Sequence, residues 1–328
     1  MAAILPMNAT PATAAPARAA AAQRARRPVS LQNRRWFPWL LMAPALVILL
    51  AVGLFPFGYS IYLATTNIIL SKPYLPHAYV ALEQFQEIVQ DGDFFNALRV
   101  TAIFTGAAVF LEFWAGLGLA LLFRRQFRGK AIYRLGILVP MVLPPVVVGL
   151  IWQYLLFPNS GLVSHYSGRI AAFLGVAAPT FLSDPASALR TLILVDVWQW
   201  TPFMFLILHA GLASIPLEPY EAAEIDGASA WRIFWTITMP MLKSSILIAL
   251  VIRTMDAFRT YDTIAVLTQG GPGNSTETLN IWLTNLGFKF FEASKAAALS
   301  LIVFVIILAF SSVFIRVFSR ASRVGDAS

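Results

Sequence analysis

Residues 221–244 read EAAEIDGASAWRIFWTITMPMLKS and interrupt a chain that is strongly apolar on both sides. Acidic residues occupy the first turns of this segment, where negative charge favours a helix dipole. Gly227 then breaks or bends the helix, or lets another backbone approach closely. The next stretch is amphipathic, carries Trp231, Phe234 and Trp235, and is expected to end at Pro240. The segment therefore predicts two short helices joined at a glycine elbow.

The composition of the 328-residue chain indicates that lipid surrounds most of it. Hydrophobic residues make up 58% of the chain and charged residues only 12%, whereas a soluble domain carries about 25% charged residues. So few charges cannot cover a globule of this size with polar surface. We therefore expect an all-α integral membrane protein. Cysteine is absent, which excludes a disulfide framework and a thiolate metal site.

Six apolar stretches reach membrane length, which is about 20 residues. They lie at 36–62, 100–123, 135–157, 191–213, 244–268 and 296–315. Pro140, Pro144 and Pro145 fall in the third stretch, so a kink or break is expected there. Together the stretches predict a transmembrane domain of six helices over residues 36–318.

The two ends of the chain are expected to lie outside this domain. Residues 1–35 are rich in Ala, Pro and Arg without periodicity, which indicates a disordered tail, and residues 319–328 form a second, short tail. A cleaved signal peptide is the competing interpretation of the N-terminal region. The first apolar stretch is too long for one and lacks a clear cleavage site, so an uncleaved first span is favoured.

Lys and Arg gather on one side of the predicted spans, and the positive-inside rule assigns that side to the cytoplasm. The richer side holds Arg18, Arg24, Arg26, Arg27, Arg34, Arg35, Arg124, Arg125, Arg128, Lys130, Arg134, Arg232, Lys243, Arg316, Arg320 and Arg323. The poorer side holds Lys72, Arg99, Arg169, Arg190, Lys289 and Lys295. Both termini and the loop at 214–243 are therefore expected in the cytoplasm. The net charge of +8 is explained by topology, and no nucleic-acid partner is expected.

The acidic and aromatic loop at 214–243 suits docking to a cytoplasmic partner. The alternative is an interfacial helix that lies on lipid headgroups. Anionic lipid would repel the acidic face, so docking is favoured.

At these residues the chain resembles the permease subunits of binding-protein-dependent ABC importers. Their signature is E-A-A, three residues, G, nine residues, then I-x-L-P. It appears here with Met239 in the usual Leu position, a change that keeps the apolar volume. The resemblance implies a type I importer permease fold and a coupling helix that contacts an ATPase subunit. The coupling residues it implies are Glu221, Ala222, Ala223, Asp226, Gly227, Ile237 and Pro240.

Further residues are similar to carbohydrate-importer permeases, in the subunit type that pairs with a second, different permease. They include Thr201-Pro202-Phe203 and the stretch from Thr268 to Thr276. Residues 253–259 are similar to trehalose-type permeases, and residues 197–203 to polyol permeases, so the sugar stays open. The resemblance implies a bacterial inner-membrane complex with a second permease, two ATPase domains that bind ATP and Mg, and an external sugar-binding protein.

The chain itself offers no site for nucleotide or metal chemistry. The phosphate-binding pattern G-x-x-x-x-G-K-[ST] does not occur in it, so we expect no ATP hydrolysis by this chain. His77, His165 and His209 have no metal-ligand spacing, and no catalytic triad pattern appears, so we expect neither a metal nor an enzyme.

Charged residues inside the apolar stretches are candidates for a polar pathway, because intramembrane charges usually face a cavity. Arg253, Asp256, Arg259 and Asp262 alternate in sign every three residues, and neighbours in such a series can pair on a helix. On one continuous helix, Arg253 and Asp262 would lie on opposite faces. We assign Arg253 and Asp256 to an ion-pair ladder. The candidates for the substrate pathway are Arg259, Asp262, Asp196, Gln199 and Glu112.

Two other classes of membrane protein compete with an importer permease. A secondary transporter often shows inverted repeats and two interrupted helices, which the sequence does not reveal. An integral-membrane enzyme needs a concentrated polar site, and the carboxylates outside the loop are scattered. Purification separates the classes, because a permease should bring an ATPase subunit with it.

Overall fold

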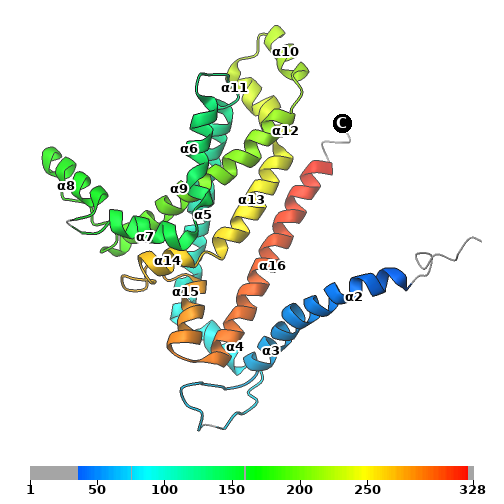
Figure 1. Cartoon of the computed structure of the whole chain (residues 1–328), viewed down its shortest axis with the longest axis vertical. Coiled ribbons are helices and arrows are strands. Elements are labelled where there is room, and N and C mark those ends of the chain that lie inside the picture. Colours follow the sequence, from blue (N-terminus) through cyan, green and yellow to red (C-terminus); the bar gives the residue numbers. More distant parts are fainter. Residues whose placement is uncertain (1–35, 75, 159, 324–328) are drawn as a thin grey trace, which may run out of the picture. The chain divides into compact units, whose positions relative to one another are not determined.

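The computed structural model describes residues 36–74, 76–158 and 160–323, and these residues are predominantly helical. Their β contact is an isolated bridge between Thr66 and Tyr79. The chain divides into two compact units at Tyr59 (Figure 1). The whole predicted tail at 1–35 and residues 324–328 lie outside the described part. The last helix, α16 (Ala293–Arg323), reaches into the predicted C-terminal tail at 319–328.

The first unit contains a long apolar helix that covers the expected span at 36–62. It consists of α2 (Phe37–Leu49), the π-helical turn η2 (Leu50–Leu54) and α3 (Phe55–Ala64), whose last residues belong to the second unit. The π turn ends two residues before Pro56, which has no backbone N–H to donate. The Phe55 N–H bonds the Leu50 carbonyl five residues back, so the helix passes the proline without ending.

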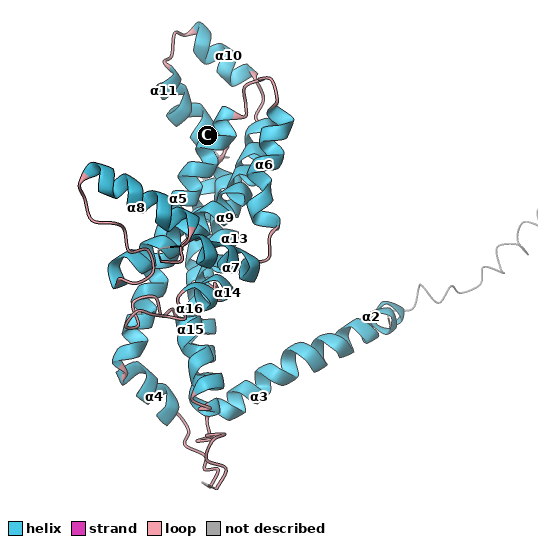
Figure 2. Cartoon of the chain, turned by 60° about the vertical axis from the view of Figure 1, so that its left-hand side comes forward, coloured by secondary structure: helices cyan, strands magenta, loops and turns pink. Residues whose placement is uncertain are grey.

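Three helices of the second unit, α5, α9 and α13, pack against one another (Figure 2). They run over Gly92–Leu122, Pro185–Ser214 and Lys243–Phe258. Glycines make the crossings close. A Cβ on Gly116 of α5 would lie 2.6 Å from the Met204 Cβ and 2.9 Å from the Phe205 nitrogen of α9. A Cβ on Gly211 of α9 would lie 2.7 Å from the Ser245 Cβ of α13.

The third expected span breaks at its prolines, as predicted. Helix α6 (Lys130–Val142) and helix α7 (Pro145–Leu155) meet at an angle of 99°. Leu143 and Pro144 between them have extended backbone, because a residue before proline is pushed out of the helical region. Helix α8 (Leu162–Leu174) follows α7.

The fifth expected span at 244–268 corresponds to the run Lys243–Leu267, which is divided into two helices. Helix α13 ends at Phe258, and α14 (Asp262–Leu267) begins four residues later. The break contains neither Gly nor Pro, so the sequence gives no local signal for it. The Asn280 Nδ2 donates to the Phe258 carbonyl at 3.1 Å, and this distant side chain supports the end of the helix.

Short helices and loops close one end of the second unit. They include α4 (Glu83–Gln90), α15 (Leu279–Thr284) and the π-helical turn η4 (Asn285–Lys289). The segment after α3 is tied to the start of α16, because the Ile68 N–H donates to the Ser294 Oγ at 2.8 Å. Lys295 of α16 pairs with Asp91 before α5 at 3.2 Å.

The opposite end of this unit holds three segments that lie on the predicted cytoplasmic side, where Lys and Arg are in excess. The α5–α6 connection, the segment from α10 to α12, and the last turns of α16 lie together there in both views (Figures 1 and 2). Four described helical runs are long and apolar enough to cross a membrane, or up to six if each of two bent helix pairs, α6 with α7 and Ala230–Met241 with Lys243–Leu267, is one span. The upper count equals the number of expected spans.

We expect Gly116→Val to destabilise the protein by about 1–3 kcal/mol, because a larger side chain overpacks the crossing of α5 and α9. Gly118→Val is the matched control, since a Cβ at Gly118 meets no heavy atom of the described chain within 4 Å. The midpoint of thermal unfolding in detergent measures both. Equal shifts for the two variants would show that the crossing is not close-packed.

Candidate functional site

The predicted glycine elbow joins α10 (Glu218–Ile225) to α11 (Ala230–Ile233). Gly227 has a φ of +72°, which disfavours residues with a Cβ. Its N–H bonds the Glu224 carbonyl at 3.1 Å, and the Ala228 N–H bonds the Ala223 carbonyl at 2.9 Å. These two bonds form a Schellman motif, which ends α10. The Ser229 Oγ then accepts from the Arg232 N–H at 3.3 Å and caps α11.

The elbow presents acidic and apolar groups to the surroundings. Glu221, Ala222, Asp226 and Gly227 are exposed, and Ala223 is half-buried. A Cβ added at Gly227 would find no heavy atom of a described residue within 4 Å. The space around the glycine is therefore open, as docking of another chain requires.

Aromatic rings extend this exposed surface along the next helix. Trp231 is 72% exposed, and its ring centroid lies 5.6 Å from that of Trp235 and 6.1 Å from that of Phe234. Ile225 at the end of α10 is 86% exposed. Trp231 and Ile225 thus add large apolar groups to the exposed surface of the elbow.

The aromatic segment ends one residue after Pro240, in agreement with the sequence prediction, because the helical run Ala230–Met241 meets the run Lys243–Leu267 at an angle of 66°. The π-helical turn η3 (Phe234–Thr238) ends two residues before Pro240, which lies inside α12 (Met239–Met241). The Met239 N–H bonds the Phe234 carbonyl five residues back, so the helical run accommodates the proline and ends at Met241, before the bend to α13. Ile237 lies within the π turn.

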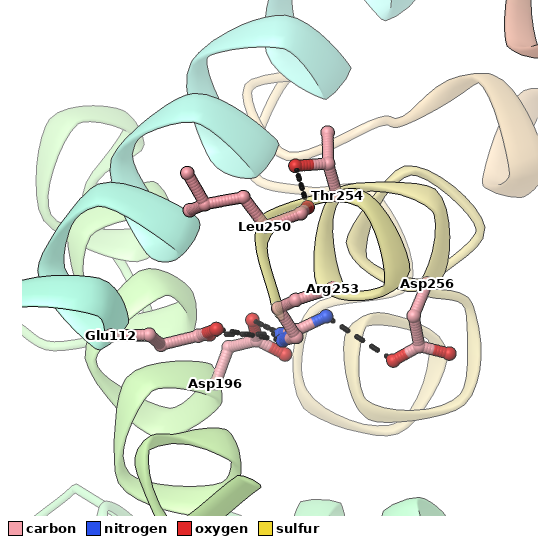
Figure 3. Close-up of polar contacts among 6 residues, drawn as sticks. All are labelled: Glu112, Asp196, Leu250, Arg253, Thr254 and Asp256. Atoms are coloured by element: carbon pink, nitrogen blue, oxygen red, sulfur yellow. Dashed lines mark hydrogen bonds and ion pairs between the residues drawn. The ribbon is translucent and has the colours of Figure 1, made fainter. Parts of the chain in front are cut away.

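A cluster of buried charges lies between α5, α9 and α13 (Figure 3). The Arg253 guanidinium donates to both carboxylate oxygens of Glu112, at 2.7 and 2.9 Å, and also to Asp196. Its third carboxylate is Asp256, one turn along α13, at 3.2 Å. The exposed fractions of Arg253, Glu112 and Asp196 are 1%, 0% and 2%, whereas the Asp256 side chain is 54% exposed. We call these four residues the Arg253 cluster.

The cluster changes the interpretation of the charged series on the fifth span. Arg253 and Asp256 form the predicted pair three residues apart. Arg259 and Asp262 lie beyond the end of α13, so the helical wheel that placed Arg253 and Asp262 on opposite faces does not apply. The stronger partners of Arg253 are Glu112 and Asp196, which the sequence analysis had assigned to a substrate pathway.

A cavity of about 130 Å³ adjoins the cluster at the two helix breaks. Pro145 of α7, Asp196 and Trp200 of α9, and Asp256 of α13 line it together with residues 259–263. The structure thus brings Arg259, Asp262, Asp196 and Asp256 to one cavity. The Trp200 ring centroid also lies 5.2 Å from the Arg253 guanidinium carbon, within the range of a cation–π contact.

Gln199 stabilises the break between α6 and α7. Its side chain is 1% exposed, and its Nε2 donates to the Leu143 carbonyl at 3.2 Å. Leu143 lies between α6 and α7, where a carbonyl has lost its helical partner. The bond therefore supplies a donor at the break.

Tyr220, Arg124 and Thr238 hold α10 against the helices, and no sequence pattern predicted this role. Tyr220 is 7% exposed although the residues after it are exposed. An aromatic residue beside an acidic motif was the available signal, but its burial depends on distant residues.

The family model described as "Binding-protein-dependent transport system inner membrane component" matches residues 112–324. The chain belongs to this family. The match covers the Arg253 cluster and the glycine elbow. This permease is therefore an inner-membrane component of a binding-protein-dependent transport system, and the predicted family is confirmed.

Individual proteins agree with this assignment. A probable ABC transporter permease of Sinorhizobium fredii is 37% identical to the permease, over 92% of this chain and 96% of the relative. The trehalose transport system permease SugA of Mycobacterium tuberculosis is 34% identical, over 92% of this chain and 95% of SugA. A solved structure of a bacterial alginate ABC transporter, in complex with an alginate-bound periplasmic protein, contains a similar chain. The TM-score is 0.73 and the sequence identity 21%, over 88% of this chain and 98% of the solved chain. The expected importer permease fold is thus confirmed.

Proposed function

We propose that the permease is one of two different membrane-spanning subunits of an ATP-driven sugar importer. It forms half of the translocation pathway and couples that pathway to a separate ATPase. ATP and Mg are bound by the ATPase partners, and an external binding protein delivers the sugar. Both termini and the elbow face the cytoplasm in this proposal, in agreement with the distribution of Lys and Arg.

The exposed elbow at Gly227 is the observation that carries the coupling role. It combines a rigid backbone, capped on both sides, with open space at the glycine and exposed Glu221 and Asp226. A partner backbone can approach where no side chain intervenes, and basic groups of that partner can pair with the carboxylates. Trp231 and Ile225 add apolar contact area.

The cavity beside the Arg253 cluster supports a sugar as substrate. Asp256 and Asp262 can accept hydrogen bonds from hydroxyl groups, Arg259 can donate them, and Trp200 and Tyr261 offer aromatic faces. At about 130 Å³ the cavity is smaller than typical ligand pockets of about 300–1,000 Å³. Transport therefore requires the pathway to widen, with walls from the second permease.

Trehalose or maltose is the substrate we propose, by analogy with the trehalose permease SugA. A polyol or glycerol phosphate is the alternative within the same class. A free anion would meet the carboxylates of Asp256 and Asp262 in the cavity, which favours a neutral sugar. A self-contained secondary transporter is the less supported class, and sugar accumulation by this chain alone in proteoliposomes would establish it.

Gly227→Trp should weaken binding of the ATPase while the helices stay assembled. A blocked contact at an interface centre costs about 2 kcal/mol or more, which corresponds to about 30-fold weaker binding. Gly175→Trp is the matched control, because Gly175 has a φ of +68° and likewise no described heavy atom within 4 Å of an added Cβ. Co-purified ATPase and sugar uptake by the reconstituted complex are the measurements.

The control separates strain at a positive φ from obstruction of the partner. We expect the Gly175 variant to keep ATPase binding and uptake, and the Gly227 variant to lose both. Normal ATPase binding and uptake in the Gly227 variant would contradict the coupling role. Glu221→Lys should act in the same direction, since it reverses a charge offered to the partner.

Arg259→Ala and Asp262→Ala should leave the complex assembled and lower sugar uptake, because both residues line the cavity without belonging to the buried cluster. Loss of one hydrogen bond to a charged group costs about 1.5–3 kcal/mol. We therefore expect the half-saturating concentration in an uptake assay to rise about tenfold or more. Lys289→Ala, outside the cavity lining, is the control. Normal uptake by both cavity variants would remove these residues from the pathway.

A further inference from the structure

Tyr220 stands directly before the Glu221-Ala222-Ala223 motif and differs from it in environment. Its side chain is 7% exposed, and it belongs to an apolar cluster with Phe123, Leu242 and Ile246. Phe123 follows the last residue of α5, and Leu242 precedes the first residue of α13. The tyrosine ring therefore enters the place where α10 meets the ends of two membrane helices.

Two specific contacts hold the ring in this place. The Arg124 guanidinium carbon lies 4.0 Å from the ring centroid, which is a cation–π contact. The Tyr220 hydroxyl donates to the Thr238 Oγ1 at 3.2 Å. Thr238 is 3% exposed and ends the π turn η3, whereas Arg124 is exposed on the α5–α6 connection. One side chain thus joins three segments that are distant in the sequence.

The joined segments lead to the Arg253 cluster. Helix α5 carries Glu112 about ten residues before its end, and α13 carries Arg253 about ten residues after its start, which is about 15 Å along each helix. The Arg253 cluster links these two helices again through an ion pair. A displacement of α10 that acts on both helix ends is therefore passed to α13, which lines the cavity, and to α5, which is ion-paired to α13.

We propose that Tyr220 is a positioning residue that transmits movement of the elbow to α5 and α13. This inference rests on the proposed function, because it needs an ATPase that moves the elbow. The exposed elbow binds the partner, and Tyr220 ties the elbow to the pathway. Without this tie, the ATPase can dock and hydrolyse ATP while the membrane helices respond weakly.

A role in packing alone leads to different expectations. If the ring only fills space, Tyr220→Phe and Arg124→Gln should behave like the unaltered protein, and any loss in Tyr220→Leu should follow its thermal stability. If Tyr220 transmits movement, loss of the guanidinium, the hydroxyl or its acceptor should each reduce coupling. Thr238→Val removes that acceptor with little change in shape.

The test measures sugar transported per ATP hydrolysed by the complete complex in proteoliposomes, with sugar-loaded binding protein supplied outside. We expect this ratio to fall about tenfold in Tyr220→Leu and about threefold in Tyr220→Phe, Thr238→Val and Arg124→Gln. In the double variant of Arg124→Gln with Tyr220→Leu, the ratio should be no lower than in Tyr220→Leu alone, because both substitutions remove the same Arg124–Tyr220 contact. Arg125→Gln removes the same charge from the next residue and should leave the ratio unchanged.

Each outcome has one meaning. A normal ratio in Tyr220→Phe, Thr238→Val and Arg124→Gln, with uptake by the unaltered complex intact, would overturn the role of Tyr220. Additive losses in the double variant would overturn it as well. Failure of the unaltered complex to take up sugar would instead overturn the proposed function. If Tyr220→Leu fails to assemble, Arg124→Gln still tests the proposal. Arg124 is exposed, so its substitution leaves the buried packing in place.

Discussion

Arg253 of α13 binds Glu112 of α5 and Asp196 of α9, and these two ion pairs hold the three helices in register. Its third partner, Asp256, lies on the same helix as Arg253. Any one of these charges alone would be costly in a membrane, by at least about 2.5–3.5 kcal/mol on insertion scales. Removing one partner of a buried ion pair leaves the others uncompensated, which costs about 3–5 kcal/mol. The bidentate contact with Glu112 also fixes orientation, because both oxygens of the carboxylate are bound. Sliding α5 against α13 by one residue would break it.

The two broken spans depend on polar side chains in the same region. Backbone groups released at a break find no water in the hydrocarbon region, so protein groups must bind them. Gln199 binds the Leu143 carbonyl at the first break, and Asn280 binds the Phe258 carbonyl at the second. Both breaks then face the cavity that Asp196 and Asp256 line. The cavity is thus a consequence of where the helices break and of how their ends are held.

Local chemistry explains what the sequence could predict. The glycine elbow, the break at Pro144 and the membrane-length stretches follow from residues that act on their own neighbourhood. The break after Phe258 and the burial of Tyr220 could not be predicted, because their causes lie in residues remote in the sequence. Asn280 is 22 positions from Phe258, and Thr238 is 18 positions from Tyr220.

The sequence could have predicted part of the Arg253 cluster, namely which stretches supply its carboxylates. The second and fourth stretches each hold one carboxylate, Glu112 and Asp196, and the fifth holds two arginines. Neutralisation of intramembrane charge points to a pairing between these stretches. Residue types alone could not show whether Arg253 or Arg259 is the partner, because the choice depends on where α13 ends. The roles of the elbow and cavity residues in transport stay predictions.

Thermal unfolding of the purified complex tests the central claim that mutual neutralisation in the Arg253 cluster fixes the three-helix core. The comparison is between Arg253→Met alone and the triple variant Arg253→Met, Glu112→Met, Asp196→Leu, which replaces the buried charges by apolar groups of similar shape. The account predicts that the single variant loses about 3–5 kcal/mol and that the triple variant recovers most of this loss. A triple variant that is as unstable as the single one, or a single variant as stable as the unaltered protein, would contradict it.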